Sequence, residues 1–139
     1  MQNSENLPSR NLMVGVAAFA TSLIAHNANH ARLGIAASPE AVVWAGTLVL
    51  MLSAVMVTLA VAGHALAPQF CAVGGVVIAL GVAASHLLPK WGPLSDPILT
   101  EPASFVTRLA VFGEIAGAAF LAYMALRAIR TQRTSNKLA

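Results

Sequence analysis

Four long apolar runs constrain the fold of this chain more than any other feature of its sequence. They cover about residues 11–30, 41–63, 70–88 and 104–128. A helix needs about 20 apolar residues to cross a hydrocarbon core of roughly 30 Å. Within lipid, an uninterrupted run of this length satisfies its backbone hydrogen bonds only as a helix. The pattern therefore predicts an all-α, polytopic membrane protein, a four-helix transmembrane bundle with up-down-up-down topology that forms a single transmembrane domain over residues 1–139.

The composition excludes several other classes of protein. Of the 139 residues, 58% are hydrophobic and only 9% are charged, which leaves too few polar residues for an aqueous domain. The single cysteine, Cys71, excludes an internal disulfide and a cysteine-rich zinc site. No small-residue cleavage site follows the leading stretch "MQNSENLPSR", so we expect the first apolar run to be retained rather than removed as a signal peptide.

The basic residues are divided unevenly between the two ends of the predicted bundle. The end that carries both termini holds Arg10, Arg127, Arg130, Arg133 and Lys137, whereas the other end holds Arg32, Lys90 and Arg108. The excess of positive charge on the cytoplasmic side of membrane proteins predicts a cell-membrane location with both termini cytoplasmic. A basic C-terminal tail of this kind is typical of a membrane flank and indicates lipid, not nucleic acid, as the partner of these charges.

Four ionisable side chains are predicted to share one depth in the membrane. At the helical rise of 1.5 Å per residue, His26, His30 and His86 lie about 22, 28 and 24 Å from the cytoplasmic ends of their helices, and Glu114 lies about 20 Å up. An ionised side chain near the bilayer centre costs roughly 2.5–3.5 kcal/mol, so such residues normally face the bundle interior. We therefore expect these four residues to converge in the outer half of the bilayer.

The chemistry of this cluster has several interpretations. His26 and His30 are spaced i, i+4 and share a helix face, so with His86 and Glu114 they could bind a transition metal, namely copper, zinc or iron. A haem held by His26 and His86 is a second interpretation. The isolated HxxxH spacing is a weak signal, and the same groups could simply hydrogen-bond between helices. A proton or small-molecule pathway is the remaining alternative.

The long connection over residues 89–103 is the second feature of interest. It contains four prolines, so we expect an irregular ordered loop or a re-entrant cap rather than a helix. Loops of this length in compact domains are often functional, and Lys90, Trp91 and Asp96 are candidates for contact with a partner or for a lid over the cluster. The alternative is a plain interfacial connection that Trp91 anchors.

Two local motifs make structural predictions. The stretch "ASPEA" predicts Ser38 as the N-cap of the second helix. The GxxxG spacing of Gly113 and Gly117 predicts close helix packing, either within the bundle or at a dimer interface.

These features favour an accessory or stabilising subunit of a larger membrane complex, since almost none of the chain is expected to lie outside the membrane. We expect its partners to be the lipid bilayer and other membrane-protein subunits or a second copy of the chain, and we expect no enzymatic activity and identify no catalytic residue. One alternative is a membrane protein that binds a transition metal or haem through the histidine cluster. A further alternative is a proton-coupled small-molecule transporter that acts as an oligomer with Glu114 as its membrane carboxylate.

Overall fold

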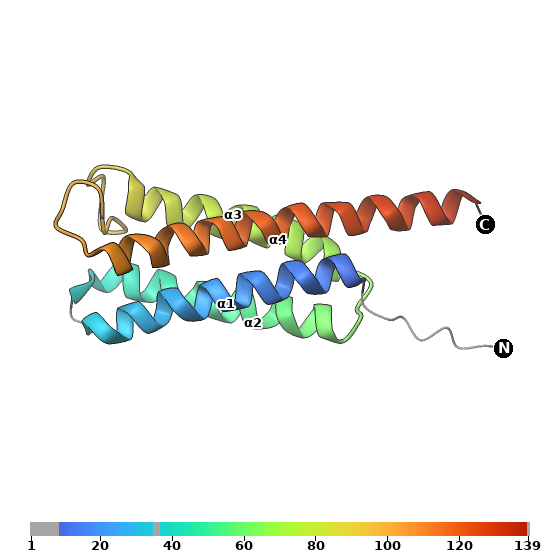
Figure 1. Ribbon diagram of the computed structural model, residues 1–139, viewed down its shortest axis with the longest axis horizontal. Coiled ribbons are helices and arrows are strands. Elements are labelled where there is room, and N and C mark those ends of the chain that lie inside the picture. The colour runs from blue at the N-terminus through green and yellow to red at the C-terminus, as the bar shows by residue number, and fades with distance from the viewer. Residues whose placement is uncertain (1–8, 35–36, 139) are drawn as a thin grey trace.

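The computed structural model describes residues 9–34 and 37–138 and is helical throughout apart from its connections (Figure 1). Its four helices are α1 (Arg10–Leu33), α2 (Glu40–Val61), α3 (Ala67–Leu87) and α4 (Phe105–Leu138). Each is long and apolar enough to cross a membrane. The predicted all-α, four-helix transmembrane bundle is confirmed.

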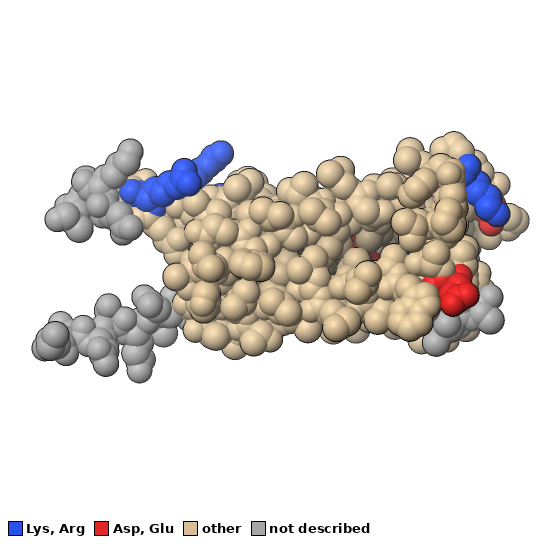
Figure 2. All heavy atoms as spheres, turned by 180° about the vertical axis from the view of Figure 1, so that it is seen from behind, with Lys and Arg blue, Asp and Glu red and all other residues tan. Residues whose placement is uncertain are grey.

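The helices alternate in direction along the bundle (Figure 1). Helix α1 begins and α4 ends at one end, which we call the terminal end, while the α1–α2 connection and the loop over residues 88–104 lie at the other, the loop end. Helix α4 packs against both α1 and α3, and α2 packs mainly against α3. Figure 2 shows basic side chains near both ends, acidic side chains near the loop end, and a broad belt with almost no charge on its surface between them, as expected for a protein that spans a bilayer.

Small residues bring α4 close to its neighbours. A Cβ atom on Gly75 would lie 2.7 Å from the carbonyl oxygen of Ala118, and one on Gly15 would lie 2.9 Å from the Cβ of Met124. Only glycine allows the backbones to approach this closely in lipid, where dispersion contacts rather than the hydrophobic effect hold helices together.

The two glycines of the GxxxG motif face different surroundings. A Cβ on Gly117 would meet Ser22 and Phe19 of α1, whereas one on Gly113 would find no atom within 4 Å. Gly117 therefore serves packing inside the bundle, as one of the two alternatives predicts. A dimer interface at Gly113 stays a prediction.

Several helix boundaries differ from the sequence-based expectation by a few residues, among them the end of α1 at Leu33 instead of residue 30. Helix α3 begins at Ala67, before the expected residue 70, because Pro68 occupies its first turn, where the missing N–H costs nothing. Helix α4 continues past residue 128 to Leu138, since its polar tail contains no helix breaker. The prediction that Ser38 is the N-cap of α2 is wrong, because Pro39 takes that position and no side chain caps the helix.

Candidate metal centre

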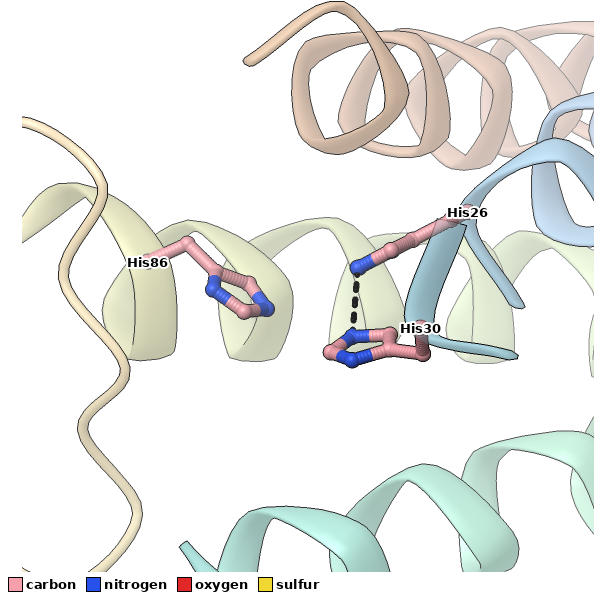
Figure 3. Close-up of side chains that lie close together, drawn as sticks. All are labelled: His26, His30 and His86. Carbon is pink, nitrogen blue, oxygen red and sulfur yellow. Dashed lines mark hydrogen bonds between the residues drawn. The ribbon is translucent and has the colours of Figure 1, made fainter. Parts of the chain in front are cut away.

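Three histidines meet at the loop end of the bundle (Figure 3). His26 and His30 come from α1 and His86 comes from the last turn of α3. The ring centroids of His26 and His30 are 4.7 Å apart, and that of His86 is 5.3 Å from His26 and 6.2 Å from His30. One ring nitrogen from each residue lies within 4.8 Å of the other two, so the three side chains form a cluster of the size that one metal ion needs.

Topology explains why these residues meet. Helices α1 and α3 run in the same direction, and both end at the loop end, so residues near their C-termini share one depth. The i, i+4 spacing places His26 and His30 on the same face of α1. Glu114 reaches the same level from α4, where it is 3% exposed. The structure thus brings together all four residues that the sequence grouped.

The loop over residues 88–104 is held against the end of α3 by its backbone. Asp96 donates its N–H to the carbonyl of Ser85 at 2.9 Å, and Ile98 donates to the carbonyl of His86 at 2.9 Å. The indole Nε1 of Trp91 donates to the carbonyl of Ala84 at 2.8 Å. These bonds fix Asp96 directly beside the histidines.

Asp96 orients two of the three imidazoles. The Nδ1 of His86 bonds to the carbonyl oxygen of Asp96 at 2.8 Å, and because a carbonyl only accepts, this nitrogen carries the ring proton. The hydroxyl of Ser38 donates to the Asp96 carboxylate at 3.3 Å and lies 3.2 Å from the Nδ1 of His30. Since the hydroxyl proton is already donated, Ser38 accepts from His30, whose proton is then also on Nδ1.

Glu114 orients the third imidazole. Its carboxylate bonds to the Nδ1 of His26. An ionised carboxylate only accepts, so His26 also carries its proton on Nδ1. The arrangement leaves the Nε2 atoms of all three rings as acceptors that face one another.

The contact between His26 and His30 follows from this arrangement. Their Nε2 atoms are 3.0 Å apart. With both protons on Nδ1, two nitrogen lone pairs point at each other across this distance, which is repulsive unless a metal ion or a further proton lies between them. The two nitrogens are therefore placed to share either a metal ion or a proton.

The charges around the cluster also favour a cation. The carboxylates of Glu114 and Asp96 both lie behind the imidazoles, bonded to His26 directly and to His30 through Ser38. The nearby Arg32 bonds instead to the amide oxygen of Asn29 at 2.8 Å. Three neutral imidazoles with two carboxylates leave about two negative charges, which one divalent cation balances at a depth where unbalanced charge is costly.

The distances fit a metal of ordinary coordination geometry. Zinc–nitrogen bonds of about 2.0–2.1 Å in a tetrahedral site place neighbouring ligand nitrogens about 3.4 Å apart. The observed separations, 3.0 Å for His26 and His30 and under 4.8 Å for the whole set, bracket this value.

The positions of Glu114 and His26 bear on the two cofactor interpretations. The sequence suggested Glu114 as a metal ligand, and the structure places its carboxylate behind His26, on the side away from Nε2. The rings of His26 and His86 pack edge to face at an interplanar angle of 63°, and His30 stacks against His26. A haem held on both faces needs a flat slot between its two histidines, and these contacts leave none.

A pocket of about 400 Å³ adjoins the cluster between α1, α2 and α3. All three histidines line it, together with Trp91 from the loop, while Lys90 is exposed at the surface. A metal bound by the three Nε2 atoms would therefore have its remaining coordination position beside this pocket.

Sequence reasoning missed the roles of Ser38 and Asp96 in the site. The sequence predicts Asp96 for contact with a partner or for a lid over the cluster, but not that its carboxylate and its carbonyl both face the histidines. The sequence predicts Ser38 as a helix cap only. The only sequence signal for either role is that both are polar residues at the same predicted end of the bundle as the histidines.

No protein-family model, curated protein or solved structure is detectably similar to this chain. Its four spanning helices are those of a multi-pass membrane protein, and the buried histidine cluster is its distinguishing feature. The chemistry of that cluster therefore carries the functional argument.

Proposed function

We propose that this chain is a metal-binding membrane protein in which His26, His30 and His86 bind one divalent transition-metal ion through their Nε2 atoms. The observation that carries the proposal is that every Nδ1 has an oxygen partner while one ring nitrogen from each histidine lies within 4.8 Å of the other two. Metal-binding histidines almost always donate their other ring N–H to a carboxylate, a carbonyl or a similar acceptor, which fixes the ring and raises its basicity.

The ligand set favours zinc. Imidazole binds zinc, copper, iron and nickel, but three histidines with one further position is the arrangement of catalytic zinc sites. The charge of Zn²⁺ balances the charges of Glu114 and Asp96. Zinc also does not require its ligands to lie in one plane. The further position, beside the pocket, is where water or a substrate would bind.

The other functions expected from the sequence have less support. A haem is disfavoured by the packing of His26 against His30 and His86. Roles as an accessory subunit of a larger complex or as an oligomeric proton-coupled transporter stay predictions, as does the cytoplasmic placement of both termini. Each is compatible with a bound metal.

Metal stoichiometry tests the proposal. The full chain in phosphatidylcholine nanodiscs, equilibrated with Zn²⁺ and then dialysed, is expected to retain about one zinc per chain by elemental analysis. Changes to residues that only hydrogen-bond to a metal ligand lower metal affinity by about 10–100-fold. His86→Ala removes a ligand itself and should lower the zinc affinity by more than that. His64→Ala is the matched control, because His64 lies in the α2–α3 turn at the terminal end and accepts the N–H of Leu66 at 3.2 Å.

Helical content by circular dichroism separates loss of the site from loss of the fold. The proposal is overturned if the folded wild-type chain retains no zinc, copper or iron, or if folded His86→Ala binds zinc as tightly as the wild type.

A further inference from the structure

The pocket beside the histidines has one polar end and otherwise apolar walls. Leu48, Val49 and Leu52 of α2 face Val77 and Val82 of α3 across it. Its polar lining is concentrated at the cluster, where the three histidines, Asn27, Ser85 and Glu114 contribute. A pocket of about 400 Å³ is large enough for a small organic ligand, and this one suits a molecule with an apolar body and a polar head.

Two glycines create the space. Gly46 on α2 and Gly81 on α3 both line the pocket, and a Cβ on either would meet no atom within 4 Å. Nearer the terminal end the same two helices close on each other, where a Cβ on Gly74 would collide with Met56. Helices α2 and α3 therefore separate toward the loop end, and the two glycines leave open space there.

The pocket opens sideways, toward lipid. Leu48 and Val77, which face each other from α2 and α3, are 67% and 58% exposed. Figure 2 shows a hollow in this face, between the charged ends, with acidic atoms visible in its depth. In a bilayer the belt is surrounded by acyl chains, so a ligand reaches this pocket from within the membrane.

The charge balance of the site selects the head group of such a ligand. A divalent ion on the three neutral imidazoles already offsets Glu114 and Asp96, so an anionic head group would bring uncompensated charge into the membrane. We propose that the pocket binds a neutral, single-chain lipid with a hydroxyl or carbonyl head group, whose oxygen takes the remaining position on the metal. This inference rests on the proposed metal centre.

Cobalt substitution makes the metal's ligands visible. The full chain in phosphatidylcholine nanodiscs is loaded with Co²⁺, its cobalt content is measured, and its visible absorption is followed while 1-dodecanol is added. We expect a saturable change in the cobalt bands with dodecanol and none with dodecane, which has no oxygen. Dodecanoate at neutral pH should bind at least about tenfold more weakly than dodecanol because of its charge.

Two glycine variants assign the effect to the pocket. Gly81→Leu places a side chain in the empty space and should abolish the dodecanol response while cobalt still binds. Gly113→Leu is the control, because Gly113 also faces open space but lies on α4 outside the pocket, and it should respond as the wild type does.

The outcomes separate the two proposals. A folded chain that binds no Co²⁺ overturns the metal centre and this inference with it. A cobalt-loaded chain whose bands ignore dodecanol, or respond equally in Gly81→Leu, overturns the pocket inference and leaves the metal centre standing. Tighter binding of dodecanoate than of dodecanol overturns the assignment of a neutral head group.

Discussion

Replacing Glu114 by glutamine removes one negative charge from the site and little else. The amide is nearly the same shape as the carboxylate, and its oxygen can still accept the Nδ1 proton of His26. What is lost is the charge that strengthens that bond and raises the basicity of the opposite nitrogen. The variant therefore isolates the electrostatic contribution of Glu114 to metal binding.

The expected loss follows from the place of Glu114 in the site. Because its carboxylate contacts His26 rather than the converging Nε2 atoms, Glu114→Gln should leave three nitrogen ligands intact. Removing such an outer partner costs about 10–100-fold in metal affinity. At 1.4 kcal/mol per factor of ten, this corresponds to about 1.4–2.8 kcal/mol of binding free energy.

Competition with a chromophoric chelator at fixed pH measures the dissociation constant for Zn²⁺ in nanodiscs. Glu40→Gln is the control, since Glu40 is exposed at the start of α2 and lies 3.4 Å from the indole nitrogen of Trp44. Its affinity should equal that of the wild type. Wild-type affinity in Glu114→Gln would refute the reasoning that the buried carboxylate supports the site through His26.

Further predictions concern Ser38, the competition of protons with zinc for the histidines, and the packing of the helices. Ser38→Ala removes the acceptor for the Nδ1 of His30 and should weaken zinc binding by about tenfold or more in the same competition assay; unchanged affinity would show that His30 needs no such partner. Zinc affinity should fall steeply as the pH drops below about 6.5, because protons compete for the same three Nε2 lone pairs, and a flat profile down to about pH 5 would argue against histidine ligands. Gly75→Ala places a Cβ 2.7 Å from the carbonyl oxygen of Ala118 and should destabilise the bundle by about 1–3 kcal/mol in thermal unfolding, whereas Gly113→Ala should change it by under about 0.5 kcal/mol.

The spanning helices were predictable because lipid allows so few alternatives. An apolar run longer than about 20 residues has only one way to satisfy its backbone in a bilayer, so the helices and their alternation follow from hydropathy. Helix ends depend on weaker effects. Pro68 is compatible with a break between helices or with the first turn of a helix, and only the packed structure shows that it lies in the first turn of α3.

The sequence predicted the depth of the candidate site in the membrane but not its detailed geometry. Helical rise alone placed His26, His86 and Glu114 at one level, since three spanning helices share one axis direction. The rotation of each helix about its own axis is set by packing, for example by Gly75 against α4, and hydropathy carries little information on it. That rotation decides that Glu114 lies behind His26 and not beside the three Nε2 atoms.

The loop shows the same limit. Its prolines predicted irregular structure, but the bonds of its backbone to α3 turn Asp96 inward to the histidines. Ser38 likewise serves His30 instead of capping α2, because the cluster offers it both a donor and an acceptor. Both roles depend on contacts between residues far apart in the chain, which no local pattern specifies.

X-ray absorption at the zinc edge of the loaded full chain tests the central claim most directly. The account predicts three imidazole nitrogens at about 2.0–2.1 Å and one further light ligand, with the imidazole signal reduced in His86→Ala. A sulfur ligand at about 2.3 Å, which would place the metal at Cys71, or a shell of oxygens without imidazole would contradict it.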